Sequence, residues 1–197
     1  ICIEYAQKYP DLIRLFLHKR ENNIKVLGSP CGIFQITYNT FNLRGKYLAV
    51  ISGDDIWSSE VKLQKQYVYL AKHKSVSMVS LPFRSKNVEG NKVIIGKDSY
   101  KFPKASSVMY INIFSKLPEN LLKSLNEDIF FYALAQENGK WNIIYDAGGL
   151  IYNEGNNNLW NSDNNLNKQL HKINTAKQIY LTLNILNDKH TRSLTGK

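Results

Sequence analysis

The middle of this 197-residue chain alternates apolar runs with helix-like patterns, and this order limits the possible folds more than any other feature. Residues 46–52 (KYLAVIS) are apolar on both faces, as a strand is when both faces of a parallel sheet are covered, and residues 75–83 (SVSMVSLPF) predict the next strand. Residues 58–74 lie between them and show the period of a helix. This order predicts an α/β fold whose sheet is mostly parallel at its start.

Two of the expected helices have clear boundaries. In residues 58–74, Ser58 or Ser59 is placed to cap the helix. Its apolar side chains share one face and are Leu63, Tyr67, Leu70 and Ala71. Residues 126–139 begin with a capping Asn, continue with two acids and end at a Gly. The middle of this second helix is apolar nearly all round, so we expect it to be buried.

The remaining segments complete the expected sheet and divide the chain. We expect helices at residues 1–9 and 33–43, strands at residues 12–18 and 106–111, one or two strands within residues 141–152, and a hairpin or excursion over residues 84–96. From Leu166 onward a long amphipathic helix is expected, with its apolar positions at Leu170, Ile173, Ile179, Leu183 and Leu186. The resulting division is a catalytic-type domain over residues 1–160 and a helical tail over residues 161–197.

Composition favours a folded protein with anionic partners. Apolar residues make up 43% and aromatic residues 12% of the chain, and no apolar run approaches the ~20 residues that span a bilayer. The 26 Lys and Arg against 16 Asp and Glu leave a formal charge of +10. The lysines are spread along the chain, which is typical of a solvated surface, whereas a nucleic-acid binder would gather them among aromatics. The two distant cysteines, Cys2 and Cys31, favour a reduced, intracellular chain, with one disulfide as the alternative.

The first apolar strand is followed directly by Gly53, Asp54 and Asp55. The acidic pair allows two interpretations. Asp is common in turns and helix caps, so the pair can be structural. Alternatively, ligands of α/β sheets collect at the carboxyl ends of strands, where a carboxylate can hold Mg²⁺ or Mn²⁺ shared with a substrate phosphate.

The segment RGKYLAVISGDDIWSSEVKLQKQYVYLAKH, residues 44–73, resembles the central part of family 2 glycosyltransferases of the GT-A fold. In that family an Arg-Gly-Lys-Tyr lead-in precedes a strand, an acidic turn related to the DxD motif, an aromatic residue and a Lys-Leu-Gln-Lys-Gln helix. The similarity continues through YAQKYPDLIRLFLH before it, and through SSVMYINIF and NEDIFFYALAQENGK after it. As an ordered set covering residues 3–153, these motifs imply a GT-A-like mixed sheet flanked by helices.

The resemblance implies roles for the acidic turn. Asp54 would bind Mn²⁺ or Mg²⁺ on the diphosphate of a nucleotide-sugar donor, and Asp55 would brace the turn or contact the sugar. Ser52 stands where many members carry the first acid of the motif, and it can hydrogen-bond but supplies no charge. Trp57 would pack under the site or line the acceptor pocket.

The resemblance also implies a catalytic base. Asp128 matches the family's position for the group that takes the acceptor's proton, and Glu127 beside it would face the acceptor. Both acids also suit the positive end of a helix for structural reasons. Where many relatives have a metal-binding histidine, Glu154 is a possible substitute and His171 a weaker one.

Two hypotheses about function follow. The first is an inverting transferase, cytoplasmic or at the inner membrane face, that uses a glycan or lipid-linked acceptor in bacterial surface polysaccharide synthesis. The second is a non-catalytic remnant or interaction domain, because the family's first, nucleotide-binding strand would precede Ile1 and the chain reads as truncated at its N-terminus. The lysines on the polar side of the last helix, Lys168, Lys172 and Lys177, also allow contact with an anionic membrane or a partner, although such a helix more often covers the sheet of its own domain.

Overall fold

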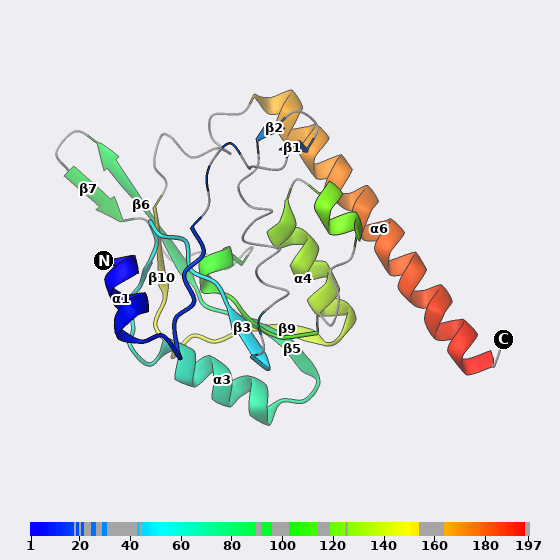
Figure 1. The fold of residues 1–197 in the computed structure, drawn as a ribbon, viewed down its shortest axis with the longest axis horizontal. Coiled ribbons are helices and arrows are strands. Elements are labelled where there is room, and N and C mark those ends of the chain that lie inside the picture. Colours follow the sequence, from blue (N-terminus) through cyan, green and yellow to red (C-terminus); the bar gives the residue numbers. More distant parts are fainter. Residues whose placement is uncertain are drawn as a thin grey trace.

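The computed structural model describes residues 1–17, 19, 21, 25–26, 29–30, 43, 45–89, 92–95, 103–113, 119–124, 126–153 and 164–195. The helices are α1 (Cys2–Lys8), α3 (Lys62–Lys72), α4 (Glu127–Glu137) and α6 (Asn165–Thr195), with short 3-10 helices η2 (Ala105–Ser107) and η3 (Glu119–Lys123). The strands are β1 (Lys25–Val26), β2 (Ser29–Pro30), β3 (Tyr47–Ala49), β4 (Ile56–Trp57), β5 (Val76–Ser80), β6 (Phe83–Glu89), β7 (Lys92–Ile95), β8 (Met109–Ile111), β9 (Lys140–Ile143) and β10 (Leu150–Asn153). The fold is therefore of the mixed α/β class, as expected (Figure 1).

The central sheet has the strand order β3-β8-β5-β9. β8 is antiparallel to both neighbours, with Tyr110 opposite Leu48 on one side and Met78 on the other. β5 and β9 are parallel neighbours. Since β8 opposes both β3 and β5, the strands β3, β5 and β9 all run in one direction. The strands at the start of the sheet therefore share a direction, as expected, but β8 returns later in the chain and separates β3 from β5.

A second sheet has the order β4-β10-β6-β7. β10 is antiparallel to β4 and parallel to β6, while β6 and β7 form the expected hairpin. β4 begins directly after the acidic turn, so this turn lies where the chain passes from the central sheet to the second sheet.

Helices cover the central sheet on both faces, which explains why every residue of β5 is buried. Met78 and Tyr110 pack with α4 on one face, while Val79 and Met109 pack with Leu70 of α3 on the other. Figure 1 shows α3 on one side of these strands and α4 on the other. α4 is buried, as its apolar composition predicts, and its core positions, such as Phe130, are fully buried.

The prediction of which face of α3 is buried is wrong. The buried side chains of this helix are Lys62, Gln66 and Leu70, whereas Leu63 and Tyr67 are exposed. The helix also begins later than expected. No side chain caps its first turn, and the hydroxyl of Ser58 instead donates to the carbonyl oxygen of Gly149.

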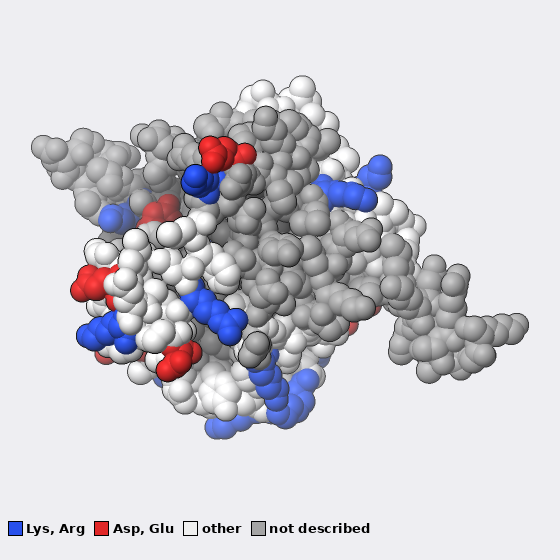
Figure 2. Space-filling view, viewed as in Figure 1, with Lys and Arg blue, Asp and Glu red and all other residues white. Residues whose placement is uncertain are grey.

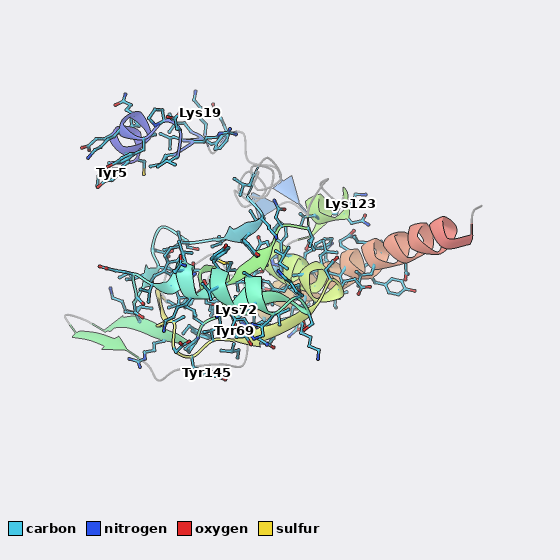
Figure 3. All side chains as sticks on the ribbon, turned by 90° about the horizontal axis from the view of Figure 1, so that it is seen from below. Tyr5, Lys19, Tyr69, Lys72, Lys123 and Tyr145 are labelled. Atoms are coloured by element: carbon cyan, nitrogen blue, oxygen red, sulfur yellow. The ribbon has the colours of Figure 1, made fainter. Side chains whose placement is uncertain are left out.

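The two ends of the chain differ from the sequence expectations. α1 forms as expected but buries no residue, and it stands apart from the rest of the molecule (Figure 3). Residues 12–17 do not form the expected strand, and residues 33–42, where a helix is expected, lie outside the described residues. α6 packs on α4 and η3 through Ile179 and Leu183, although Leu170 and Ile173 are exposed. No helix within the described ranges combines the length and apolarity needed to cross a bilayer.

Candidate active site

The acidic turn connects β3 to β4. The Asp55 N–H closes it by donating to the Ser52 carbonyl oxygen at 3.1 Å. Gly53 and Asp54 lie at its exposed tip. Within the described part of the chain, the Asp54 carboxylate takes part in no hydrogen bond or ion pair. Its oxygens are therefore open to a ligand from solvent.

Ser106 of η2 holds both ends of this turn. Its hydroxyl oxygen accepts the Ser52 N–H at 2.9 Å and donates to Asp55 Oδ2 at 2.5 Å. Its backbone carbonyl oxygen accepts the indole N–H of Trp57 at 2.7 Å. Since Ser106 is buried, these bonds form away from bulk water and restrict the turn to one geometry. The Asp55 carboxylate is thus turned toward the protein.

Trp57 lies half-buried beneath the turn and against Lys62. The Lys62 ammonium stands 4.1 Å from the centre of the Trp57 ring and donates to Gln66 Oε1 at 2.8 Å. The Gln66 side-chain amide donates in turn to the Ser107 carbonyl oxygen at 2.9 Å. Burial lowers the pKa of Lys62 to about 8, because a dehydrated ammonium is unfavourable. Trp57 therefore has packing contacts, one of the two roles expected of it.

Asp128 lies in the first turn of α4 and is half-buried. Its Oδ1 accepts the Ile129 N–H at 2.8 Å. Burial raises the pKa of Asp128, and this effect exceeds the lowering by the backbone N–H groups and by the Lys104 ammonium. A carboxylate with a raised pKa holds a proton more strongly than an exposed Asp does, which suits a general base.

Lys104 comes directly before η2 and lies over two aromatic rings of the second sheet. Its ammonium stands 3.9 Å from the ring centre of Tyr152 on β10 and 5.3 Å from that of Phe83 on β6. Its charge acts on Asp128, while Ser106, two residues later, holds the acidic turn. Residues 104–107 therefore hold the acidic turn by hydrogen bonds, whereas their effect on Asp128 is one of charge alone.

The other expected site residues are only partly described. Glu154 lies outside the described residues, and of Glu127 only the backbone, at the start of α4, is described. His171 is half-buried on α6. Over the ranges that the structure describes, no three His, Cys, Asp or Glu side chains come together as a metal site. A Mg²⁺ or Mn²⁺ ion still fits Asp54, because such ions are often held by one or two carboxylates, with phosphate and water completing the shell.

The structure also shows two cavities away from the acidic turn. One of about 300 Å³ lies against α3 and is lined by Lys65, Tyr69, Lys72 and Asp146, among others. Another of about 290 Å³ is lined by residues that include Arg84 and Tyr145. Figure 3 shows Tyr69 and Lys72 on α3 with Tyr145 beyond them. Asp54, Asp55 and Asp128 line neither cavity.

Sequence reasoning missed Ser106, Lys104 and Lys62. Ser106 lies 51 residues from Asp55 along the chain, and nothing local to SSVMYI indicates a partner there. For Lys62 a signal was present: it precedes Gln66 and Leu70 by four and eight residues, which puts all three on one helix face.

No family model matches the chain. Two proteins from strains of Mycobacterium tuberculosis and one from Mycobacterium bovis, each named only as uncharacterized, are similar to it. Each is 32% identical over 121 residues, which is 61% of this chain and 31% of the relative. The chain thus spans about a third of the length of these curated relatives.

Proposed function

We propose that this chain belongs to a metal-dependent glycosyltransferase with a GT-A-like fold. In this proposal it transfers a sugar from a nucleoside diphosphate to a hydroxyl group of a glycan or lipid-linked acceptor, in the cytoplasm or at the inner face of the membrane. The observation that carries the proposal is the acidic turn, which Ser106 holds while the Asp54 carboxylate stays exposed and unpaired within the described residues. Ser106 holds the acidic turn by hydrogen bonds, and the Lys104 charge acts on Asp128.

The proposed roles follow from the surroundings of each side chain. Asp54 is exposed and unpaired within the described residues, so it would hold the metal. A bound Mn²⁺ or Mg²⁺ ion supplies positive charge that stabilises a diphosphate leaving group. Asp55, bonded to Ser106, keeps the turn in place. Asp128 would act as the base.

In the proposed reaction the acceptor hydroxyl oxygen forms a bond to the anomeric carbon of the donor. The bond from that carbon to the diphosphate oxygen breaks, and the nucleoside diphosphate leaves with the electron pair. Asp128 takes the hydroxyl proton, and its raised pKa strengthens it for this step. Attack from the face opposite the leaving group makes the transfer inverting.

The experiment is a thermal-shift series with UDP, GDP and dTDP, each with and without Mn²⁺. A nucleotide at about 100 times its dissociation constant adds roughly 2.7 kcal/mol to the free energy of unfolding, which raises Tm by several degrees at this size. We expect a shift that needs Mn²⁺ and disappears in Asp54→Asn. Glu60→Gln, which removes an exposed acid shortly after the turn, is the matched control and should keep the shift.

A non-catalytic interaction domain is the second candidate. It is favoured by Ser52, which supplies no charge where the family has an acid, and by the lack of a three-residue metal group within the described ranges. No shift with any nucleotide, or a shift that Asp54→Asn retains, would favour this candidate over the transferase.

A further inference from the structure

The outward face of α6 carries apolar side chains. Leu166 is 70%, Leu170 50%, Ile173 65% and Tyr180 65% exposed. Together with Lys177 these residues follow one another at intervals of four, three, four and three positions, so they form a single line along the helix, here named the outer stripe. Leu181 lies beside it and is 39% exposed.

The inward face of α6 is more polar than the outer stripe. Thr175, Gln178 and Thr182 are buried there. The Thr175 hydroxyl oxygen lies 3.2 Å from that of Ser124, and the Asn120 amide donates to Thr182 Oγ1 at 3.1 Å. Ile179 and Leu183 add apolar contact with the core. Since α6 is attached in this way, its outer apolar side chains do not contribute to its packing on α4 and η3.

Exposed apolar surface is unfavourable in water by about 25 cal/mol per Å², and continuous patches of it usually mark an interaction site. The outer stripe is open to such an interaction, because α6 lies at the edge of the molecule and its C-terminal part extends beyond the body (Figures 1 and 3).

Charge decides between the possible occupants. α6 carries Lys168, Lys172 and Lys177, and residues 164–187 contain neither Asp nor Glu. Figure 2 shows basic side chains standing out where Figure 1 places this helix. A second copy of the chain would bring the same lysines together, with no acid among residues 164–187 of either helix to pair with them. An anionic lipid surface supplies both negative headgroups and an apolar layer.

We infer that α6 is a membrane-contact helix, which lies in the plane of an anionic bilayer with its outer stripe in the headgroup–acyl boundary. Lys177 extends from the stripe to the phosphates, while the exposed Lys172 lies about 100° around the helix from Ile173, on the side of Ile179 and Leu183. This inference does not depend on the proposed transferase activity, because it uses neither the acidic turn nor Asp128.

The test is flotation of the whole chain with vesicles of phosphatidylcholine and phosphatidylglycerol at 3:1, compared with phosphatidylcholine alone. We expect binding to the anionic vesicles only, lowered about tenfold or more in Leu170→Gln/Ile173→Gln, since each buried apolar group contributes to partitioning. Leu63→Gln on α3 and Leu12→Gln in the N-terminal segment remove leucines that are 41% and 83% exposed. These two control variants should bind as the parent does.

Two further measurements test the charge of the helix and its depth in the lipid. Lys172→Gln/Lys177→Gln should weaken binding to anionic vesicles by roughly 30-fold at low salt, because each basic residue near the surface adds about fivefold. The variant Tyr180→Trp places a tryptophan in the outer stripe. A brominated lipid should quench its tryptophan fluorescence more than that of the parent, and this readout does not rely on loss of binding.

The inference is wrong if the parent binds neutral and anionic vesicles equally, if it binds neither, or if the stripe variant still floats as the parent does. It is also overturned if analytical ultracentrifugation without lipid shows a dimer that Leu170→Gln/Ile173→Gln dissociates, since a second copy would then cover the stripe.

Discussion

The hydroxyl of Ser106 both accepts from the Ser52 N–H and donates to Asp55, so a single buried oxygen joins the two ends of the acidic turn. Ser106→Ala leaves both partners without this bond. We expect a loss of ~1–3 kcal/mol in the free energy of unfolding, measured by urea denaturation. In the proposed transferase, the apparent affinity for Mn²⁺ should fall as well, because Asp54 is carried by the same turn.

Ser107→Ala is the matched control for this prediction. Ser107 is also buried, but its hydroxyl donates to the carbonyl oxygen of Lys104, the residue directly before the same short helix. Its removal should lower stability by a similar or smaller amount and leave the Mn²⁺ dependence unchanged. Equal effects of both variants on the Mn²⁺ dependence would show that Ser106 has no special role in placing the turn.

Lys62 gives the stability of the molecule a pH dependence of definite sign. Its pKa is about 8 in the folded chain against an ordinary value of 10.5, so the unfolded chain binds more protons between these two pH values. Stability therefore rises as the pH increases through this window. Between pH 7 and 9.5 we expect a gain of roughly 2 kcal/mol, measured by urea denaturation.

Lys62→Met removes the titrating group and keeps an apolar side chain of similar length, so the rise with pH should flatten. Lys72→Met on the same helix replaces an exposed lysine and should keep the rise. The series stops at pH 9.5 because Tyr110, whose pKa is raised by burial, contributes in the opposite direction once ordinary tyrosines ionise. A flat profile in the parent would contradict the assignment.

Asp128 should show opposite effects on activity and stability. Because burial raises its pKa, the folded state binds the proton more strongly than the unfolded state, and ionisation of Asp128 lowers stability as pH rises through the folded pKa. At pH 7, Asp128→Asn should therefore leave the free energy of unfolding equal or higher. In the proposed transferase it should lower the transfer rate by ~10²–10⁴-fold.

A structural role for Asp128 would give the reverse pattern, with lower stability and no separate effect on the rate. Glu137→Gln, an exposed acid at the other end of α4, is the control and should change neither quantity. In the parent, the acidic limb of the rate profile should lie at a higher pH than expected for an exposed Asp.

At the scale of single elements, α3 shows how one helix can present a face different from its apolar pattern. Leu70 is 1% exposed and Leu63 is 41% exposed, although both belong to the apolar set of the sequence. We therefore expect Leu70→Ala to cost about 2–5 kcal/mol and Leu63→Ala less than about 1 kcal/mol in thermal or urea unfolding. Similar losses in the two variants would show that the expected face is the buried one after all.

The sequence predicted those elements whose burial is visible in their own composition. The middle of α4 is apolar nearly all round and is buried, and β5, read as a strand from its sequence, is buried at every residue. For α3 and α6 the apolar pattern did not identify the buried face. Polar side chains lie on the inner faces of both helices, where they contact partners far along the chain. Gln66 bonds to Ser107, and Thr175 contacts Ser124. Hydrophobic periodicity contains no information about such partners.

For the same reason, the order of the strands in the sheet could not be predicted from local sequence. β8 separates β3 from β5, although it follows the β6–β7 hairpin in sequence. Pairing between distant segments depends on how the whole sheet is completed. The acidic turn could be found from the sequence because strand, Gly and two acids are adjacent, whereas its support by Ser106 could not.

At the scale of the whole molecule, charge is the property that the sequence states most directly. The formal charge is +10, and the described residues contain two ion pairs, Lys65–Asp146 and Lys19–Glu21. Like charges on one compact body repel, and unfolding lets them move apart. Added salt therefore screens more repulsion than attraction in this chain.

We expect Tm to rise when NaCl is increased from 10 to 150 mM, because the Debye length falls from about 30 Å to about 8 Å. Lys72→Glu/Lys74→Glu, at two exposed positions, lowers the formal charge by two per exchange, from +10 to +6, and should reduce the rise. Lys72→Gln/Lys74→Gln should fall between this variant and the parent. Equal salt dependence in all three would mean that local pairs, and not the charge of the molecule as a whole, determine the response. With that outcome, the charge of the whole molecule would no longer be a reason to expect an anionic partner. The local charge of α6 would remain one.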